Sequence, residues 1–437
     1  MMEGFSSVLP ERFLDLKKEL VNNGEAQERL TQAWNEILAN LETMTKEAIE
    51  TGPEIIPQID FSEIDSLSSE KLADIKRRGG VVIRNVVDDA EALRWTDSLR
   101  EYVKVNPVDG LPLDNKQFFM LYWTQSQVRA RSHPNVLKVS TWLNTLYGAP
   151  DGNIPEGVHL DQPLSYADRF RIRHAGGRWN DHKPHIDGGS IERWEDDEFR
   201  NCFAEILQGD WRKHNPYNIT NRLNAKSSLY GRPNQSSVFR TFQGWLALSE
   251  TGPGEGTLKL FPDVLLSNAY LILRPFFRPV EQPVSSDPLD PQNWKFDIST
   301  TEFPGIYTGE GGGFYGPRLS SATHPHMRID EVMTSIPKVW PGDMVFWHCD
   351  VVHSVEPEHV GKNDSAAIYI PAVPSTPANR EYLERQRQAF LRGVPPPDFP
   401  QVKDESEGEK PHQGNGVVSD ISGDGRRAMG FEVSVGA

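Results

Sequence analysis

The chain has 437 residues, with only two cysteines and a formal net charge of −16 at pH 7. Such a charge opposes binding to phosphate backbones and anionic membranes, so nucleic-acid and membrane partners are not expected. Two cysteines are too few for a disulfide framework or a thiolate zinc site. No stretch approaches the roughly 20 apolar residues of a membrane span, and no secretory signal is visible. We therefore expect a soluble, cytoplasmic protein.

The N-terminal part of the chain has helical character. Residues 11–50 carry apolar side chains at three-, four- and seven-residue spacings among charged ones, which predicts amphipathic helix. We assign residues 1–58 to an N-terminal helical extension, which ends in the proline-containing connector TGPEIIPQIDF. RRGGVVIRNVV then predicts a strand and DDAEALRWTDSLREYV a capped helix, at the entry to a main domain over residues 59–400.

The middle of the chain is rich in β-forming residues. Between about 165 and 375, turn clusters separate the apolar runs RFRIR, SSVFRTFQGWLALS, GTLKLFP, AYLILRPFF, DMVFWH and AAIYIPAV. Short strands at such spacing predict a barrel or sandwich. ANREYLERQRQAFLRG returns to helical spacing, and the polar residues 401–437 predict a disordered tail. The expected fold class is a mainly β core with flanking helices (α+β).

The segment KPHIDGGSIERW carries a candidate metal site. Alternate residues of a strand share a face, so His185 and Asp187 are expected to point to the same side. The two glycines that follow allow the backbone to turn away and leave space beside an ion. Two histidines and one carboxylate form the facial triad of non-haem iron(II) oxygenases. An isolated His-x-Asp triplet is more often the end of a surface strand, so a second histidine is needed.

That histidine is offered by PGDMVFWHCDVVHSVEP. A Pro-Gly-Asp turn leads into a predicted strand over residues 344–347, and the strand ends in a polar cluster with His348 and His353. Either residue could complete the triad by chemistry alone. The one that does not is expected to be a hydrogen-bonded histidine, and Asp350 is a suitable partner for His348.

These motifs resemble the Fe(II)/2-oxoglutarate-dependent oxygenase superfamily. The fuller set YADRFRIR, HIDGGSIERW, HSVEP, SAAIYIPAVP and GVPPPDFP is similar to its YbiU-like family, over residues 60–400. The resemblance implies a double-stranded β-helix (a jelly-roll, cupin-like barrel) and a dioxygenase that uses Fe(II), 2-oxoglutarate as cosubstrate and O2. It also implies His353 as the distal iron ligand, with His348 as the runner-up. No catalytic residue beyond the metal ligands is expected.

The superfamily usually holds the C5 carboxylate of 2-oxoglutarate with an arginine in an Arg-x-Ser arrangement after the distal histidine. Here Ser365 is in position, but Asn363 stands where the arginine is expected, and Lys362 is the nearest cation. RFRIR offers Arg171 and Arg173 from another strand. We therefore take these four as candidate cosubstrate-binding residues: Arg171, Arg173, Lys362 and Ser365.

Some of these residues have simpler interpretations. Arg169, Arg171 and Arg173 share one face of a predicted strand, and a solvated face paired with acids is the alternative. Arg274, inside an apolar run, is a further candidate anchor. His324 and His326 could bind metal, but their Gly/Ser/Pro-rich segment is interpreted as a loop covering the pocket. Three tryptophans are interpreted as core residues: Trp245, Trp340 and Trp347. The glycines at 311–313 lack the context of a phosphate loop.

The predicted activity is oxidation of a C–H bond of a small molecule, by hydroxylation or by desaturation or ring closure. Arginines near the site suit a carboxylate or an amino acid. Two alternatives remain open: a cupin-like metalloenzyme that does not use 2-oxoglutarate, and a non-catalytic β-barrel binding module. The sequence leaves the substrate and the oligomeric state undefined.

Overall fold

The computed structural model describes residues 5–21, 24–179, 181–309 and 312–431. The α-helices are α1 (Arg12–Leu20), α2 (Gly24–Thr51), α3 (Ser69–Arg78), α4 (Asp89–Val105), α5 (Gln125–Ser132), α6 (Pro134–Thr145), α7 (Glu192–Glu195), α8 (Asp197–Asn201), α9 (Ala204–Leu207), α10 (Val264–Leu273), α11 (Ile329–Val332), α12 (Pro377–Arg392) and α13 (Gly423–Ala428). Short 3-10 turns connect several of them.

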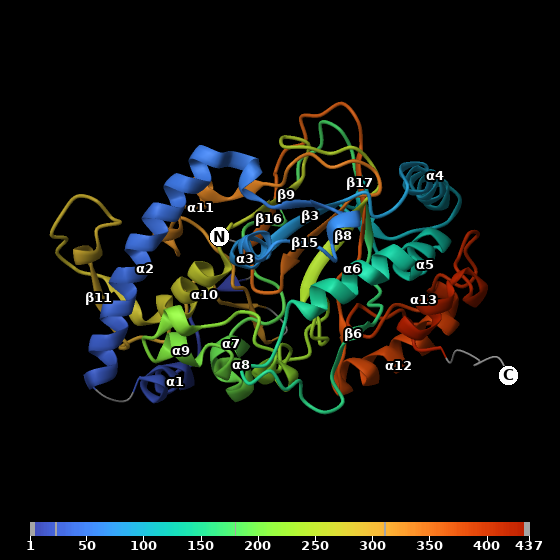
Figure 1. The fold of residues 1–437 in the computed structure, drawn as a ribbon. Coiled ribbons are helices and arrows are strands. Elements are labelled where there is room, and N and C mark those ends of the chain that lie inside the picture. Colours follow the sequence, from blue (N-terminus) through green and yellow to red (C-terminus); the bar gives the residue numbers. More distant parts are fainter. Residues whose placement is uncertain (1–4, 22–23, 180, 310–311, 432–437) are drawn as a thin grey trace.

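The central element is an eight-stranded sheet (Figure 1). Its strands, in spatial order, are β2 (Gln58–Asp60), β3 (Gly80–Arg84), β15 (Met344–His348), β8 (Phe242–Ala247), β17 (Ser365–Tyr369), β7 (Phe170–Arg173), β5 (Phe118–Phe119) and β4 (Gly110–Leu111). β2 runs parallel to β3, and the other neighbours are antiparallel. The central strands β15 (MVFWH) and β8 (FQGWLA) are buried along their whole length, because both faces of the sheet are covered there.

A second, three-stranded sheet has the order β14 (Thr334–Ser335), β9 (Leu258–Leu260), β16 (His353–Val355). Three further strand groups are small: β1 (Phe5–Ser6) with β12 (Tyr307–Gly309) and β13 (Phe314–Tyr315), β10 (Phe277–Pro279) with β11 (Trp294–Phe296), and β6 (His159–Pro163) with β18 (Pro374–Ser375).

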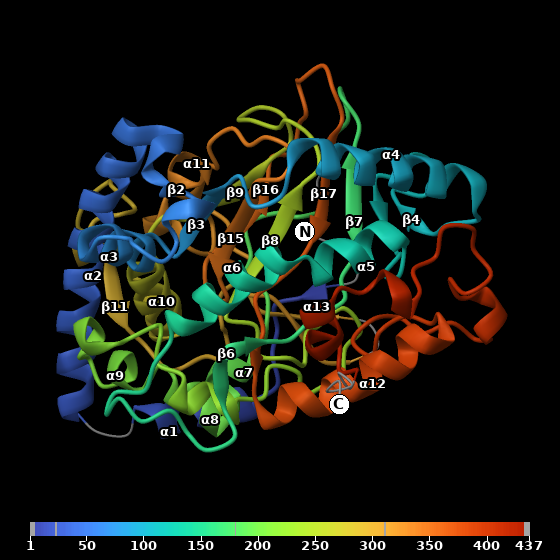
Figure 2. The same cartoon turned by 45° about the vertical axis from the view of Figure 1, so that its right-hand side comes forward.

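Helices α4, α5 and α6 lie together along one side of the large sheet (Figure 2). Thr96 Oγ1 of α4 donates a hydrogen bond of 2.6 Å to the carbonyl of Leu248, directly after β8. Tyr147, which follows α6, stacks on His348 at the end of β15 with ring centroids 5.5 Å apart. This face of the sheet is therefore closed by helices, and any ligand must approach the other face.

The predicted N-terminal helix is confirmed as two helices, α1 and α2, and residues 22–23 between them lie outside the described residues. Trp34 of α2 is 1% exposed and stacks on Tyr270 of α10 and on Phe277, with centroids 5.0 and 4.4 Å apart. Burying such an aromatic side chain contributes on the order of 2–3 kcal/mol. Helix α2 therefore packs on α10, and both N-terminal helices contribute residues to the main hydrophobic core.

The prediction of a strand for AYLILRPFF is wrong, because most of it lies in helix α10 and a following 3-10 turn. Asp263 caps the helix by accepting a hydrogen bond from the Leu266 N–H at 2.9 Å. Nine of the ten α10 residues are buried. A helix buried on all sides shows no helical periodicity, so its sequence looks like that of a buried strand.

The prediction of a disordered tail is wrong for residues 401–431, which include helix α13 and pack on the domain. The carboxylate of Glu409 accepts hydrogen bonds from the backbone N–H groups of Tyr122 and Trp123, at 2.8 and 2.9 Å. Ile421 and Met429 are 3% and 2% exposed in a second hydrophobic cluster. A few well-placed contacts therefore order a segment whose average composition is polar.

The fold is a mixed one, with a large sheet and surrounding helices, which confirms the predicted β core with flanking helices. Trp340, predicted to be a core residue, is 45% exposed. Among the described residues, no helix combines the length and the apolar character needed to cross a membrane.

Candidate metal centre

His185 and Asp187 lie in an extended segment that is joined to the edge of the three-stranded sheet. His185 bridges His353 on β16, and the two residues exchange backbone hydrogen bonds of 3.0 and 2.9 Å. Residues in such an antiparallel pair project to the same side, and the two imidazole rings lie 4.3 Å apart between centroids. The segment forms two isolated bridges, from His185 to His353 and to Arg318, rather than the predicted strand. The alternation holds, because Ile186 between the two ligands is buried.

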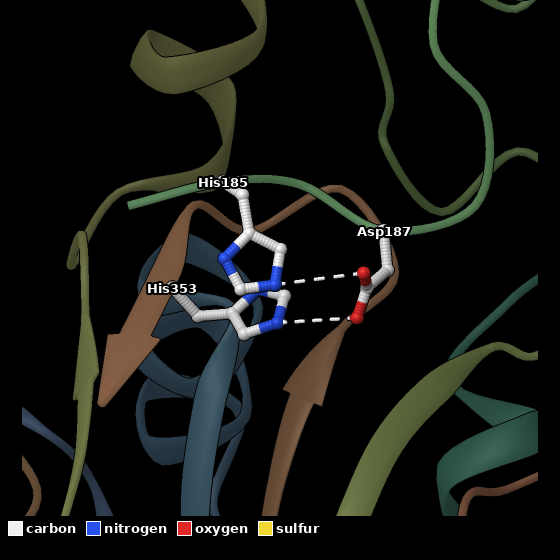
Figure 3. Close-up of side chains that lie close together, drawn as sticks. All are labelled: His185, Asp187 and His353. Atoms are coloured by element: carbon white, nitrogen blue, oxygen red, sulfur yellow. Dashed lines mark ion pairs between the residues drawn. The ribbon is translucent and has the colours of Figure 1, made fainter. Parts of the chain in front are cut away.

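The three side chains converge (Figure 3). His353 Nε2 lies 3.3 Å from Asp187 Oδ2, and His185 Nε2 lies 3.5 Å from Asp187 Oδ1. The ligand atoms of the three residues all lie within 4.8 Å of one another. Neighbouring ligands at about 2.1 Å from an octahedral ion lie about 3 Å apart. The observed distances are close to this value, so the three residues fit one divalent ion.

Backbone carbonyls orient both imidazole rings. His185 Nδ1 lies 2.6 Å from the Lys183 carbonyl oxygen, and His353 Nδ1 lies 3.0 Å from that of Val351. A carbonyl only accepts, so Nδ1 carries the proton and Nε2 has a free lone pair. Burial, together with His353, lowers the pKa of His185 to about 4. Its ring is therefore neutral at pH 7, as a metal ligand must be.

Asp187 is ionised. Enclosure raises the pKa of its carboxyl group, but His185 and His353 lower it more, so it stays well below its ordinary value. The chain turns away directly after Asp187, with φ +71° at Gly188 and +106° at Gly189. A Cβ atom at Gly189 would lie 2.6 Å from Phe199 Cε1, so glycine is required there by both conformation and space.

A buried ionic cluster holds this turn from behind. The Arg193 guanidinium donates to Asp350 at 2.8 Å and to the carbonyl oxygens of Asp187 and Gly188 at 3.1 and 3.4 Å. Arg222 donates to the other oxygen of Asp350. Arg193, Arg222 and Asp350 are all buried. This cluster was not predicted from the sequence, because its members are far apart in the chain and follow no short motif.

His348 lies outside the triad. Its Nε2 is 2.6 Å from the Tyr147 hydroxyl and its Nδ1 accepts from the Asp350 N–H at 3.1 Å. Its ligand atoms lie close to those of Cys349 and Asp350, but both ring nitrogens are already hydrogen-bonded. The structure therefore brings His353, and not His348, to His185 and Asp187.

The triad lines a cavity of about 430 Å³. Trp245 and Trp347 line it from the large sheet, and Leu258, His353 and Val355 from the three-stranded sheet. Trp245 and Trp347, predicted as core residues, are buried but form part of this wall. The cavity thus lies between the two sheets, and its size suits a small molecule.

The candidate cosubstrate residues differ in position. Arg171 lines the cavity, and its buried Nε has no hydrogen-bond partner among the described residues. Arg173 points elsewhere: it donates to the carbonyl oxygens of Glu356 and Pro357 at 2.6 and 3.0 Å. Ser365 is buried 3.1 Å from Thr251 Oγ1, and Lys362 is exposed. The cavity wall therefore includes Arg171 but none of the other three candidates, Arg173, Ser365 and Lys362.

Two other candidates lie away from the cavity. Arg274 donates to the carbonyl oxygens of Thr323 and Phe277 at 2.8 and 2.7 Å. His326 packs edge-on against Trp34, with His324 buried nearby. The loop that precedes these histidines does cover the cavity, because it contributes Tyr315, Gly316 and Arg318 to the wall. Residues 310–311 lie outside the described residues.

Several cationic and imidazole groups of the cavity wall were not predicted from the sequence. Arg232, Arg240 and Arg318 come from loops without a recognisable pattern. His182 Nδ1 accepts from the Trp179 indole N–H, so its Nε2 carries the proton. Burial lowers the pKa of His182 to about 3, and the neighbouring His185 contributes to the shift. The His182 ring is therefore neutral at pH 7, and its Nε2–H is a hydrogen-bond donor. In the sequence, the three-residue spacing between His182 and His185 was the feature from which a place for His182 at the site could have been predicted.

Comparisons with known proteins define the family. A family model described as Gig2-like matches residues 7–431. The uncharacterised protein YbiU of Escherichia coli K12 is 30% identical over 397 residues, 87% of each chain, which confirms the predicted likeness to YbiU.

Two solved structures show the same fold. The crystal structure of the GlcNAc-inducible gene 2 protein of Candida albicans has a TM-score of 0.86 at 33% identity, and the match covers 97% of this chain and 90% of that one. A protein of Salmonella typhimurium LT2, provisionally named an oxidoreductase, has a TM-score of 0.78 at 28% identity, with 98% and 99% covered. The chain therefore belongs to the Gig2-like family.

Proposed function

We propose that this protein is a non-haem Fe(II)/2-oxoglutarate-dependent oxygenase whose iron is held by His185, Asp187 and His353. The observation that carries the proposal is the convergence of two imidazole nitrogens and one ionised carboxylate within 4.8 Å, at the wall of a 430 Å³ cavity. Nitrogen and oxygen ligands of this number are those of the facial triad, which keeps further positions open for other ligands.

Arg171 is the proposed anchor for the C5 carboxylate of 2-oxoglutarate. In the sheet it stands directly opposite Ala367 of β17, the strand that begins two residues after Asn363, the position where the superfamily pattern expects the arginine. Directly opposite residues of an antiparallel pair share a face, so an arginine on β7 reaches the same side of the sheet. Its buried Nε without a partner supports a ligand there, because a buried unpaired donor is costly.

The proposed barrel is the double-stranded β-helix, and two sheets facing each other across the cavity support it. Iron with 2-oxoglutarate and O2 would supply the oxidising chemistry, with succinate and CO2 as coproducts. The chain would bind and orient a small substrate so that one of its C–H bonds faces the metal, and Trp245, Trp347 and Leu258 would keep water away from it.

The test is an anaerobic titration of the protein with Fe(II) and then with 2-oxoglutarate, monitored through the weak visible metal-to-ligand charge-transfer band. His353→Ala should abolish iron binding, whereas the matched variant His348→Ala should retain it. Arg171→Gln should keep the iron and weaken 2-oxoglutarate binding about 10- to 100-fold, as expected for loss of a charge-assisted hydrogen bond. Iron binding that survives in His353→Ala contradicts the assignment.

A cupin-like metalloenzyme that does not use 2-oxoglutarate is the second candidate, favoured by Asn363 at the position expected for the anchoring arginine. It predicts iron binding without the charge-transfer band. A protein that takes up no iron would instead support the non-catalytic binding module.

A further inference from the structure

The cavity wall carries an excess of positive charge. Six of its residues are cationic and three are acidic: Arg169, Arg171, Arg232, Arg240, Arg318 and Lys183 against Asp168, Asp181 and Asp187. The protein as a whole has a net charge of −16, so this excess runs against the average of the chain. Like charges gathered in one enclosed space repel unless an anion joins them.

Some of these cationic groups have a counterion, either in the protein or in the proposed cosubstrate. Arg169 pairs with Asp168 at 2.9 Å and donates to Asn234 at 3.2 Å. Under the proposed function, Asp187 binds the iron and Arg171 binds a carboxylate of 2-oxoglutarate. A divalent ion on Asp187 has one uncompensated positive charge and Arg171 has another, which together match the two negative charges of 2-oxoglutarate. Cosubstrate binding therefore supplies no counterion to the other arginines of the wall.

Two of these arginines, Arg232 and Arg240, have no acidic partner among the described residues. Neither forms an ion pair with any described residue, and the buried Nε of Arg232 has no hydrogen-bond partner there. Burial raises the pKa of the nearby Glu192, and this carboxyl group accepts from the Ser190 N–H at 2.6 Å and from Gln235 at 3.3 Å rather than from Arg232.

Aromatic rings hold both guanidinium groups in position. The Arg232 guanidinium lies 3.9 Å from the centre of the Tyr315 ring, and that of Arg240 lies 5.5 Å from the centre of the Tyr166 ring. Stacking fixes the plane of a guanidinium and leaves its N–H edge available for a bidentate contact with an oxyanion. Arg240 also lines a smaller cavity together with Asp187 and Gly188, which places it on the metal side of the main cavity.

We propose that the primary substrate is an anion, and that Arg232 and Arg240 bind its carboxylate or phosphate group while the metal and Arg171 hold 2-oxoglutarate. This inference rests on the proposed function for the role of the site, but the anion site itself is defined by residues that the cosubstrate does not occupy.

The test uses two small probes, acetate and inorganic phosphate, in calorimetric titrations at low ionic strength. Each is titrated into the protein as isolated and into the protein loaded anaerobically with Fe(II) and 2-oxoglutarate. Arg232→Gln and Arg240→Gln should each weaken binding of the preferred probe about 10- to 100-fold. Arg94→Gln, at an exposed residue of α4, should leave the affinity unchanged. Arg240→Lys should restore part of the affinity, because it keeps the charge without the fork.

Tighter binding of phosphate than of acetate would identify a phosphorylated substrate, and the reverse order a carboxylate. Binding that is unchanged in both Arg232→Gln and Arg240→Gln, or undetectable at millimolar concentration, overturns the proposal. Failure of the proposed function has a separate signature, which is absence of the charge-transfer band in the unsubstituted protein. That result leaves the titrations of the unloaded protein interpretable.

Discussion

Asp350 is the residue whose substitution best tests the buried cluster behind the metal centre. Its carboxylate is 1% exposed and lies between Arg193, at 2.8 Å, and Arg222. Burial raises the pKa of Asp350, but Arg222 and Arg193 lower it more, so the group is ionised at neutral pH. Asp350→Asn preserves the shape and removes the only charge that faces both guanidinium groups within the described cluster.

Breaking one buried ion pair by removing a partner costs about 3–5 kcal/mol. Here two guanidinium groups lose the same partner, so we expect Asp350→Asn to lower the free energy of unfolding by about 4 kcal/mol at pH 7, a large fraction of the ~5–15 kcal/mol typical of native proteins. The depressed pKa means that the stabilisation is complete above the ordinary pKa near 3.8 and is lost as the pH falls through the folded-state value. The difference from the unsubstituted protein should therefore shrink only in acid.

Urea denaturation followed by tryptophan fluorescence measures this difference. Asp151→Asn, an exposed aspartate, is the matched control and should change the unfolding free energy by less than about 0.5 kcal/mol. Replacing Arg222 with Met in the Asp350→Asn background removes one unpaired guanidinium and should recover part of the loss. A loss below about 1 kcal/mol for Asp350→Asn would refute the view that this carboxylate neutralises two buried cations.

Two further predictions concern the C-terminal segment and the turn after Asp187. Burial raises the pKa of Glu409 to about 7, above its ordinary 4.5, so the free energy of unfolding should fall by about 3 kcal/mol between pH 4.5 and 7. Urea denaturation across that range measures this pH dependence, and Glu409→Gln should remove it. An unchanged pH dependence in the variant would contradict the prediction. Gly189→Ala should lower the free energy of unfolding by about 2–4 kcal/mol, because the added Cβ would contact Phe199. Gly188→Ala should lower it by only about 1–2 kcal/mol, because no atom lies within 4 Å of the added Cβ. Equal losses of the two variants in thermal denaturation would show that the contact with Phe199 is relieved.

The sequence predicted the parts of the site that depend on short-range spacing. The alternation of His185 and Asp187 acts over two residues, and the turn and strand before His353 form one continuous motif. Both could be recognised without knowledge of the fold. The choice between His348 and His353 depended on the family resemblance, because both follow the same strand and differ mainly in what lies opposite them.

The parts that were missed depend on long-range packing. Arg193 meets Asp350 across 157 residues, and Arg232 and Arg240 reach the cavity from irregular loops. Helix α10 was misinterpreted because burial on all sides removes its periodicity. The C-terminal segment was misinterpreted because a few buried groups, Glu409 among them, outweigh its polar average.

The position of Arg171 leads to a last prediction, which tests whether the proposed anchor depends on location in the sheet or on the strand that carries it. Arg171 and Ala367 are direct partners in the register of β7 and β17, so their side chains project to the same face. Arg171→Ala should weaken 2-oxoglutarate binding about 10- to 100-fold.

Adding Ala367→Arg to that variant moves the guanidinium across one strand spacing of about 4.8 Å, a distance that the flexible side chain can span. We expect it to recover at least about tenfold in affinity, measured by the charge-transfer band, or about 1.4 kcal/mol. Arg171→Ala with Ala367→Met supplies similar bulk without charge and should recover nothing. If the methionine and arginine variants behave alike while both remain folded, the cosubstrate carboxylate is not held at this point of the sheet, and the anchor must be sought among the loop arginines instead.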